Sequence, residues 1–284
     1  MSERRIRVLT HRRVSDTTVP LQRLMEAAAQ AGITLRFDAE ETAKHGIAAG
    51  PRVETDAQEG RGEVDLCVVL GGDGTILRAL QSYACTPVPV FAVNFGEIGF
   101  LATVERDDLD AGIERALHGD FELLKLPAIV LDTPAGQARA INDAAIHRKV
   151  GERVAELAYT LEGEEIGSVR CDGLVVATPA GSTGYNLANG GPVMAWGVKG
   201  FVVSFIAPHS LTARTLVVAP GDGLEIHNRS REPVDVSVDG RPLCEIPAGG
   251  RIGARFEDEV GTIAQLPGSS FYRRLREKFG RLAR

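Results

Sequence analysis

The chain has 284 residues, 44% of them apolar and 25% charged, which is the balance of an ordinary globular protein with room for two domains. Lys and Arg together number 32 against 38 for Asp and Glu, so the net charge of −6 argues against a nucleic-acid-binding protein that works by neutralising phosphates. Aromatic residues make up only 5%, which also disfavours a platform for stacking bases.

The beginning of the chain contains no apolar run of signal-peptide length, and no run approaches the roughly 20 residues of a membrane span. The four cysteines, Cys67, Cys85, Cys171 and Cys244, lack C-x-x-C spacing, which disfavours a zinc site or a disulfide framework. We therefore expect a cytoplasmic protein with reduced thiols and with neither nucleic-acid nor membrane partners.

The first part of the chain alternates strand and helix patterns. Apolar runs predict strands at 6–9, 33–37, 64–70 and 88–93, and helical spacing predicts helices at 21–31, about 75–83 and about 108–118. Residues 38–63 have little periodicity and predict a long loop with room for one short helix. This alternation is typical of a parallel sheet, whose ligands bind at the carboxyl ends of the strands.

The segment Gly71-Gly72-Asp73-Gly74-Thr75 follows the third of these strands and opens a helix. Glycines allow the backbone to approach a bulky anion, and the N–H groups at a helix start favour phosphate. A carboxylate inside a phosphate cradle would repel its ligand unless it binds a metal or takes a proton, so Asp73 indicates phosphoryl transfer. This segment matches neither the P-loop motif nor the dinucleotide-binding fingerprint. The alternative is a plain turn in which Asp73 caps the helix.

From residue 121 onward, short β-branched runs separated by turn signals predict a β-rich second domain. We expect domains at 1–120 and 121–265, followed by a segment at 266–284 that docks back. In that segment Phe271, Leu275, Phe279 and Leu282 form one helical stripe among basic residues. A docked helix with a solvated charged face is favoured over a basic membrane helix, because the stripe is narrow.

Two polar patches interrupt the β-rich part. Cys171 to Asn186 reads CDGLVVATPAGSTGYN, a strand followed by small hydroxyl residues that suit a sugar or a phosphate, although a simple turn is the alternative. Asn142 and Asp143 stand side by side in an apolar run, where they suit the two hydroxyls of a ribose or a hairpin turn. His147 and His209 have no nucleophile at motif spacing and are expected to be structural.

These patches, in this order, resemble the bacterial NAD kinase family. The resemblance rests on GGDGT, NFGEIGFL at 94–101, IND at 141–143, DGLVVATPAGSTGYNLANGGPV at 172–193, APHSLTARTLVV at 207–218 and SVDGR at 237–241. GGDGT also occurs in lipid kinases and phosphofructokinases, so the long TPAGSTGYNL segment carries most of the weight. Ala180, Gly184 and Asn189 depart from the commonest family pattern, which bears on how tightly a dinucleotide is held.

The resemblance implies an enzyme that transfers the terminal phosphoryl group of ATP to the 2′-hydroxyl of the adenosine ribose of NAD, giving NADP. It implies that Asp73 is the general base. It also implies that a divalent cation, with Mg²⁺ as the first choice, binds the donor phosphates, and no protein ligand is assigned to this cation. Arg170 resembles members that use ATP and oxidised NAD. The substrate-binding positions that it implies are Asp73, Gly74, Arg78, Asn142, Asp143, Arg153, Arg170, Asp172, Thr183, Gly184, Tyr185, Asn186, Leu187, Ala188, Ala207 and Arg241.

The expected architecture is a Rossmann-like α/β domain followed by a β-rich domain, with the active site in the cleft between the domains. The resemblance also implies a homodimer or homotetramer. Two alternatives are a lipid kinase, for which this acidic chain shows no membrane surface, and a non-catalytic dinucleotide sensor, which would tolerate loss of the carboxylate that Asp73 retains.

Overall fold

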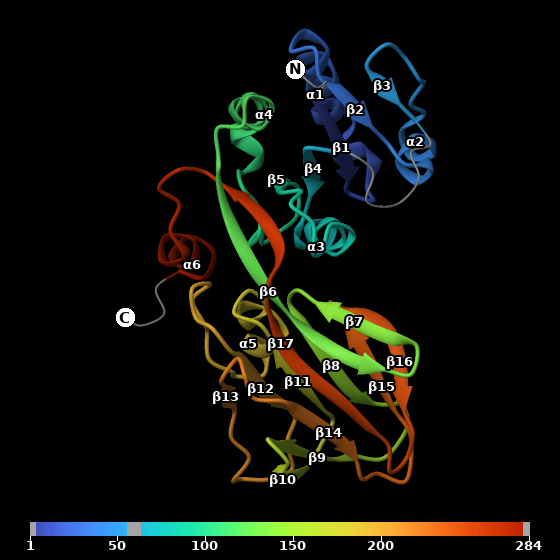
Figure 1. The fold of residues 1–284 in the computed structure, drawn as a ribbon, viewed down its shortest axis with the longest axis vertical. Coiled ribbons are helices and arrows are strands. Elements are labelled where there is room, and N and C mark those ends of the chain that lie inside the picture. Colours follow the sequence, from blue (N-terminus) through green and yellow to red (C-terminus); the bar gives the residue numbers. More distant parts are fainter. Residues whose placement is uncertain (1–3, 56–63, 281–284) are drawn as a thin grey trace. The chain divides into compact units, whose positions relative to one another are not determined.

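The computed structural model describes residues 4–55 and 64–280. The chain divides into two compact units, shown as a ribbon in Figure 1. The first unit comprises the described residues of Met1–Lys125 and Gly261–Arg284, and the second is Leu126–Val260. Each unit has its own hydrophobic core.

The first unit is built on a parallel sheet with the strand order β5-β4-β1-β2-β3. Its strands are β1 (Arg5–Thr10), β2 (Thr34–Arg36), β3 (Val53–Glu54), β4 (Leu66–Gly71) and β5 (Val90–Asn94). Its helices are η1 (Val14–Asp16), α1 (Thr18–Gln30), α2 (Ala39–His45), α3 (Asp73–Ser82), η2 (Arg106–Asp108), α4 (Leu109–His118) and α6 (Phe271–Phe279). The predicted α/β unit with a parallel sheet is confirmed.

The hydrophobic pattern explains these elements. All six residues of β4 are buried, as expected for a strand covered on both faces. In α1 the buried residues Leu21, Leu24 and Ala28 recur at helical spacing, and Gly32, with φ of +70°, follows the end of the helix.

The segment predicted as a long loop contains regular structure. Asp38 caps α2 by accepting a hydrogen bond from the N–H of Glu41 (2.7 Å), and Gly46 ends the helix in a left-handed conformation. The short strand β3 follows at Val53–Glu54. The prediction left room for one short helix, which α2 with its seven residues fills, but it did not include β3, which has only two residues. Residues 56–63 of that predicted loop lie outside the described residues.

The second unit contains two sheets. One has the order β13-β12-β11-β8-β15-β16 and is antiparallel throughout. The other has the order β10-β9-β14-β17, with β6 pairing β17 and β7. The strands are β6 (Glu122–Thr133), β7 (Gly136–Ala140), β8 (Asp143–Arg148), β9 (Ala155–Leu161), β10 (Glu164–Cys171), β11 (Gly173–Ala177), β12 (Phe201–Ile206), β13 (Leu216–Val218), β14 (Leu224–Asn228), β15 (Val234–Val238), β16 (Arg241–Ile246) and β17 (Arg251–Gln265). The predicted β-rich character is confirmed.

Side chains from both sheets form one core, in which Leu157 and Ile226 of one sheet join Ile146 and Val176 of the other. The short helices η3 (Gly181–Thr183) and α5 (Tyr185–Ala188) follow β11. They occupy the segment of small hydroxyl residues, for which a simple turn is the alternative expectation.

The limits of the compact units differ from the expected limits at 120 and 265. β6 begins in the first unit and continues into the second, and β17 runs from the second unit into the first. Ile263 of β17 pairs in parallel with Val90 of β5. Residues 261–265, expected in the β-rich domain, therefore belong to the first unit. Their position is decided by the strand with which they pair and not by the β-rich composition of the sequence around them.

Helix α6 packs within the first unit through Leu275, which is buried, and through Phe271 and Phe279, whose ring centroids lie 5.9 and 5.8 Å from that of Phe100. Leu282 of the expected stripe lies outside the described residues. Of the basic residues, Arg273 and Arg276 are exposed, as expected for a solvated charged face, whereas Arg274 and Lys278 are only partly exposed. Within the described residues, no helix has the length and apolar character needed to cross a membrane.

Candidate active site

The glycine turn between β4 and α3 owes its shape to close backbone contacts. A Cβ atom on Gly71 would lie 2.8 Å from the side chain of Thr75, and one on Gly72 would lie 2.9 Å from the Cα atom of Gly96. Side chains at these two positions would therefore push the turn apart. A Cβ atom on Gly74 would meet nothing within 4 Å, and Gly74 is exposed at the start of α3.

The carboxylate of Asp73 does not cap its own helix, so the capping alternative is wrong. The N-cap residue of α3 is Gly72, and no side chain caps this end. The Asp73 Oδ2 atom instead accepts a hydrogen bond from the N–H of Phe100 (3.0 Å), and Oδ1 accepts one from the N–H of Leu101 (2.9 Å). A loop 27 residues further along the chain therefore sets the orientation of this carboxylate.

Arg78 lies one turn further along α3 and is held by two carboxylates of α2. Its Nη1 atom lies 3.0 Å from both oxygens of Glu40, and Nη2 lies 2.9 Å from Oε1 of the fully buried Glu41. Burial acts to lower the pKa of Arg78, but its hydrogen bond to Glu40 and the charges of Glu40 and Glu41 outweigh it and raise the pKa. Sequence reasoning missed both glutamates because they lie in the segment expected to be a loop.

In the second unit, Asn142 and Asp143 stand at the start of β8 and are held from two sides. The carboxylate of Asp239, in the turn between β15 and β16, accepts hydrogen bonds from the N–H groups of Ile141 (3.0 Å), Asn142 (2.7 Å) and Asp143 (3.1 Å). Thr178, after β11, donates its hydroxyl to the carbonyl oxygen of Ile141 (2.6 Å) and its N–H to that of Asn142 (2.9 Å). The pair is therefore fixed by its backbone, which leaves both side chains available for a ligand.

The electrostatics of this pair are unusual. Asp143 is 8% exposed, and burial together with the charge of Asp239 raises the pKa of Asp143 to about 7. The Oδ1 atom of Asn142 is buried and has no hydrogen-bond partner among the described residues. A buried acceptor without a partner costs free energy, and such costs are typical of sites that complete their bonding with a ligand.

The small hydroxyl segment folds back beside this pair. The backbone of Gly181 passes so close that a Cβ atom there would lie 2.0 Å from the carbonyl oxygen of Asn142, and a Cβ atom on Gly184 would lie 3.9 Å from Oδ2 of Asp143. Tyr185 is exposed, and its ring stacks on that of His147 with the centroids 5.6 Å apart. Burial raises the pKa of Tyr185, and the charges of Asp143 and Asp172 add to that effect.

Two side chains of this segment, one of them the predicted binding residue Asn186, support its fold. The Nδ2 atom of Asn186, which is fully buried, donates to the carbonyl oxygens of Ser182 and Pro192, both at 2.9 Å. Ser182 is also buried and accepts from the N–H of Met194 (2.8 Å). The polar side chains of Ser182 and Asn186 thus hold the segment together, while Thr183, Gly184, Leu187 and Ala188 remain at least partly exposed.

The remaining predicted residues lie around the ends of β10, β12 and β15. Asp172 accepts a hydrogen bond from Nε of Arg148 (2.6 Å), a partner that sequence reasoning missed. Ala207 has φ of +43°, a strained conformation for a residue with a Cβ atom. Arg153, Arg170 and Arg241 are exposed.

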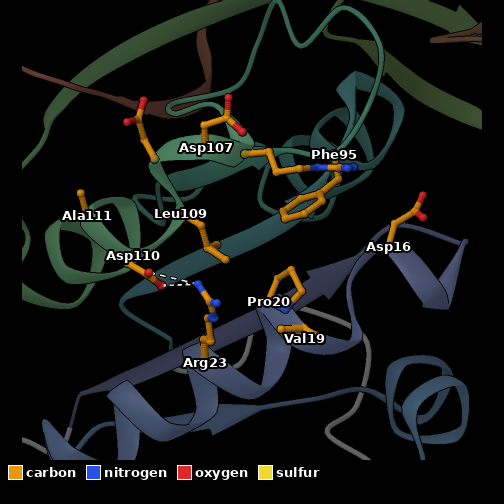
Figure 2. A pocket seen from close by; sticks show the side chains of 11 residues that line it. Asp16, Val19, Pro20, Arg23, Phe95, Asp107, Leu109, Asp110 and Ala111 are labelled. Carbon is orange, nitrogen blue, oxygen red and sulfur yellow. Dashed lines mark hydrogen bonds and ion pairs between the residues drawn. The ribbon is translucent and has the colours of Figure 1, made fainter.

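A cavity of about 390 Å³ in the first unit is separate from these residues (Figure 2). It is lined by Phe95 and by residues of η1, α1, η2 and α4, among them Asp16 and Asp107, and two of its lining residues, Arg23 and Asp110, form an ion pair at 3.0 Å. It contains neither Asp73 nor Arg78, so its lining does not contribute to the candidate site.

The side chains of the candidate site can be compared with those that bind metal ions. Among the described residues, no group of three or more His, Cys, Asp or Glu side chains is placed to hold a metal ion. Mg²⁺ in kinases is usually bound by one or two carboxylates together with substrate phosphates. Asp73 is a partly exposed carboxylate at the glycine turn, so the residues fit a metal that arrives with a nucleotide.

Comparison with known proteins agrees with this chemistry. Residues 1–121 match the model of the ATP-NAD kinase N-terminal domain, and residues 141–256 match that of the C-terminal domain. The NAD kinase of Gemmatimonas aurantiaca is 33% identical over 97% of this chain and 96% of its own length. That of Symbiobacterium thermophilum is 37% identical over 82% of this chain and 86% of its own.

Two solved structures share the fold. An NAD kinase from Archaeoglobus fulgidus, in complex with ATP, has a TM-score of 0.74 and 26% identity, covering 96% of this chain and 98% of its own. Yeast NADH kinase, complexed with NADH, has a TM-score of 0.86 at 21% identity, covering 99% of this chain and 90% of its own. The second likeness concerns the fold alone.

The α/β unit with its glycine turn and the β-rich unit that follows define a nucleotide-binding phosphotransferase. The chain belongs to the ATP-NAD kinase family. It is an enzyme with NAD kinase activity, which transfers the terminal phosphoryl group of ATP to the 2′-hydroxyl of the adenosine ribose of NAD and produces NADP.

Proposed function

We propose that Asp73 is the general base of this NAD kinase reaction. It accepts the proton of the ribose 2′-hydroxyl as that oxygen attacks the terminal phosphorus of ATP, and the bond to the leaving ADP oxygen breaks. The observation that carries this role is the fixed carboxylate at the start of α3, which accepts two N–H groups from the described part of the chain. An ionised carboxylate has about four acceptor sites, so capacity remains for the hydroxyl.

The glycine turn supplies the phosphate cradle. The first N–H groups of α3 have no partners within the helix and carry the positive end of its dipole, which favours the donor phosphates. The exposed Gly74 leaves room for a phosphate to approach the backbone. Arg78 lies further along the same helix, where Glu40 and Glu41 fix its guanidinium group, and it is proposed as a ligand contact from the resemblance.

Asn142 and Asp143 bind hydroxyls of the dinucleotide. Support comes from their immobilised backbone, from the buried Oδ1 atom of Asn142, which has no hydrogen-bond partner in the described part of the chain, and from the carboxyl group of Asp143, whose pKa is raised to about 7. Asp172, Tyr185 and the strained backbone at Ala207 are further contact points, as are other positions assigned from the resemblance. Those positions, all at least partly exposed, are Arg153, Arg170, Thr183, Gly184, Leu187, Ala188 and Arg241.

We propose that a divalent cation, with Mg²⁺ as first choice, would neutralise charge on the donor phosphates, and Asp73 is the carboxylate at the glycine turn that could help to hold it. Oxidised NAD is the proposed acceptor. This proposal rests on the resemblance that Arg170 carries. The protein is proposed to act in the cytoplasm as a homodimer or homotetramer, a state that light scattering after size-exclusion chromatography measures.

The experiment that tests this function is an assay of NADP formation. Purified protein is incubated with NAD, ATP and Mg²⁺, with omission of each in turn, and the Asp73→Asn variant serves as the control for a contaminating kinase. NADP should form only in the complete mixture. No NADP from a folded protein would contradict the proposal, and phosphorylation of a lipid in its place would favour the lipid-kinase alternative.

A further inference from the structure

Helix α6 contacts the loop that orients Asp73. The peptide groups of Phe100 and Leu101 donate their N–H groups to the Asp73 carboxylate on one side. On the other side, Nη1 of Arg274 donates to the carbonyl oxygen of Phe100 (2.7 Å) and to that of Ala102. All of these residues belong to the first unit. One stretch of three residues is therefore held between the guanidinium group and the carboxylate.

Further contacts attach α6 to both ends of the same loop. Lys278 lies 2.5 Å from Oε1 of Glu105, and Oε2 of Glu105 accepts a hydrogen bond from Nδ2 of Asn94 (2.8 Å). Asn94 also accepts from the N–H of Gly96 (2.9 Å) and packs against Gly99, where a Cβ atom would lie 2.1 Å from Nδ2. The loop therefore has few ways to move without breaking a bond to α6.

The positive charge of Arg274 interacts with the carboxylate of Asp73. Burial lowers the pKa of Arg274, and the charges of Glu105, Asp73 and Glu277 partly offset this. A guanidinium group that binds carbonyl oxygens polarises the peptide groups involved and strengthens their N–H groups as donors. A planar donor can hold two carbonyl oxygens in fixed geometry, which a lysine ammonium group cannot reproduce.

We propose that Arg274 of α6 is a positioning residue for the catalytic carboxylate of Asp73. The inference rests on the proposed function, because it assumes that Asp73 accepts the proton. It assigns the C-terminal helix to the catalytic apparatus, although Arg274 contacts the loop and not the reacting atoms. A misplacement of a catalytic group by about 1 Å can lower the rate by about 10²-fold, so a loss of this support should appear in kcat.

The test compares Arg274→Ala, Arg274→Gln and Arg274→Lys with the wild type in kcat, in KM for each substrate and in melting temperature. We expect kcat to fall by about 10- to 100-fold in the first two variants and less in Arg274→Lys, with both KM values within about threefold. The matched control is Arg276→Ala, an exposed arginine of the same helix, which should keep kcat within about twofold.

A double-mutant cycle separates positioning from general stability. Arg274→Ala introduced into Asp73→Asn should lower the residual kcat by no more than about twofold, because the group that Arg274 positions is already disabled. The proposal would be overturned if the double variant lost kcat by the product of the two factors measured for Asp73→Asn and Arg274→Ala alone. Wild-type kcat in Arg274→Ala or Arg274→Gln would also overturn it, and if neither folds, wild-type kcat in Arg274→Lys would do so.

The failure of this inference can be told apart from failure of the proposed function. If Asp73→Asn keeps near-normal kcat, Asp73 is not the base and both ideas fall together. If Asp73→Asn is impaired while all Arg274 variants turn over normally, only the role of α6 is refuted.

Discussion

The N–H of Asp239 donates to the carbonyl oxygen of Asp143 (2.9 Å), and the Asp239 carboxylate accepts from the N–H of Asp143 (3.1 Å). Asp239 has φ of +47°, so the turn after β15 adopts a conformation uncommon for residues with a Cβ atom. This reciprocal pairing fixes the backbone of Asp143 and brings a second carboxylate close to its side chain. Asp239 thus both positions Asp143 and raises its pKa.

Replacement of Asp239 by Ala should destabilise the fold and weaken NAD binding. Three N–H groups lose their acceptor, at a cost on the order of 1–3 kcal/mol for each one left buried and unpaired. We expect a lower melting temperature and a raised KM for NAD, with a smaller change in KM for ATP. Asp222→Ala, in the turn after β13, is the control and should alter neither KM. An unchanged KM for NAD in a folded Asp239→Ala variant would contradict the positioning role.

The titration of Asp143 should make stability depend on pH. The pKa of Asp143 is raised from 3.8 to about 7, because the folded protein favours the protonated carboxyl group. The contribution of this protonated group to the free energy of unfolding is therefore present in full below about pH 4 and is lost as the pH rises through about 7. Asp143→Asn cannot ionise and avoids this loss. The variant should therefore gain stability relative to the wild type between pH 5 and pH 8, by on the order of 1–4 kcal/mol. Urea unfolding of both proteins across this range measures the difference, and parallel curves would show that Asp143 does not titrate there.

Asp73→Asn should lower kcat by about 10²- to 10⁴-fold while NAD binding changes little, because the amide keeps the shape of the side chain but is not a base. The melting temperature should fall modestly, because an amide nitrogen replaces one of the two oxygens that accept the N–H groups of Phe100 and Leu101, and one of these N–H groups loses its acceptor. A series of Mg²⁺ concentrations distinguishes a metal ligand, whose defect should be partly relieved at high Mg²⁺. Near-normal kcat would remove Asp73 from the mechanism.

Asn142→Ala and Asp143→Ala should mainly raise KM for NAD. Removal of either side chain leaves a substrate hydroxyl without its partner, at a cost of about 1–3 kcal/mol. Separate titrations of NAD and ATP measure the split. A selective rise in KM for ATP would mean that this pair binds the donor nucleotide and not the acceptor.

Replacement of all four cysteines by Ser or Ala should leave turnover intact. Burial raises the pKa of Cys67 and of Cys171 to about 12, so neither is a thiolate at neutral pH. Cys85 is exposed and should react with a thiol reagent in the folded protein, whereas Cys67 should not. A quadruple variant with normal melting behaviour but no activity would contradict a purely structural role.

The sequence alone determined the main strands and helices of the first unit, the β-rich character of the second and the chemistry of the motifs. Buried runs such as that of β4 and the helical spacing in α1 are local patterns, and a glycine turn can be recognised from a few adjacent letters. The same is true of Asn142 and Asp143, whose polarity stands out within an apolar run. Residue identity therefore sufficed to name the candidate groups.

Only the tertiary structure decided which distant residues support those groups. Phe100 and Leu101 orient Asp73 through backbone N–H groups, which are present in every residue except proline and leave no trace in the sequence. Arg274 resembles its exposed basic neighbours in the sequence, yet it lies against the loop beside Asp73. Asp239 acts on a segment almost 100 residues earlier in the chain. Contacts of this kind depend on how strands pair and helices pack, and that is decided by the folded chain as a whole and not by any local pattern.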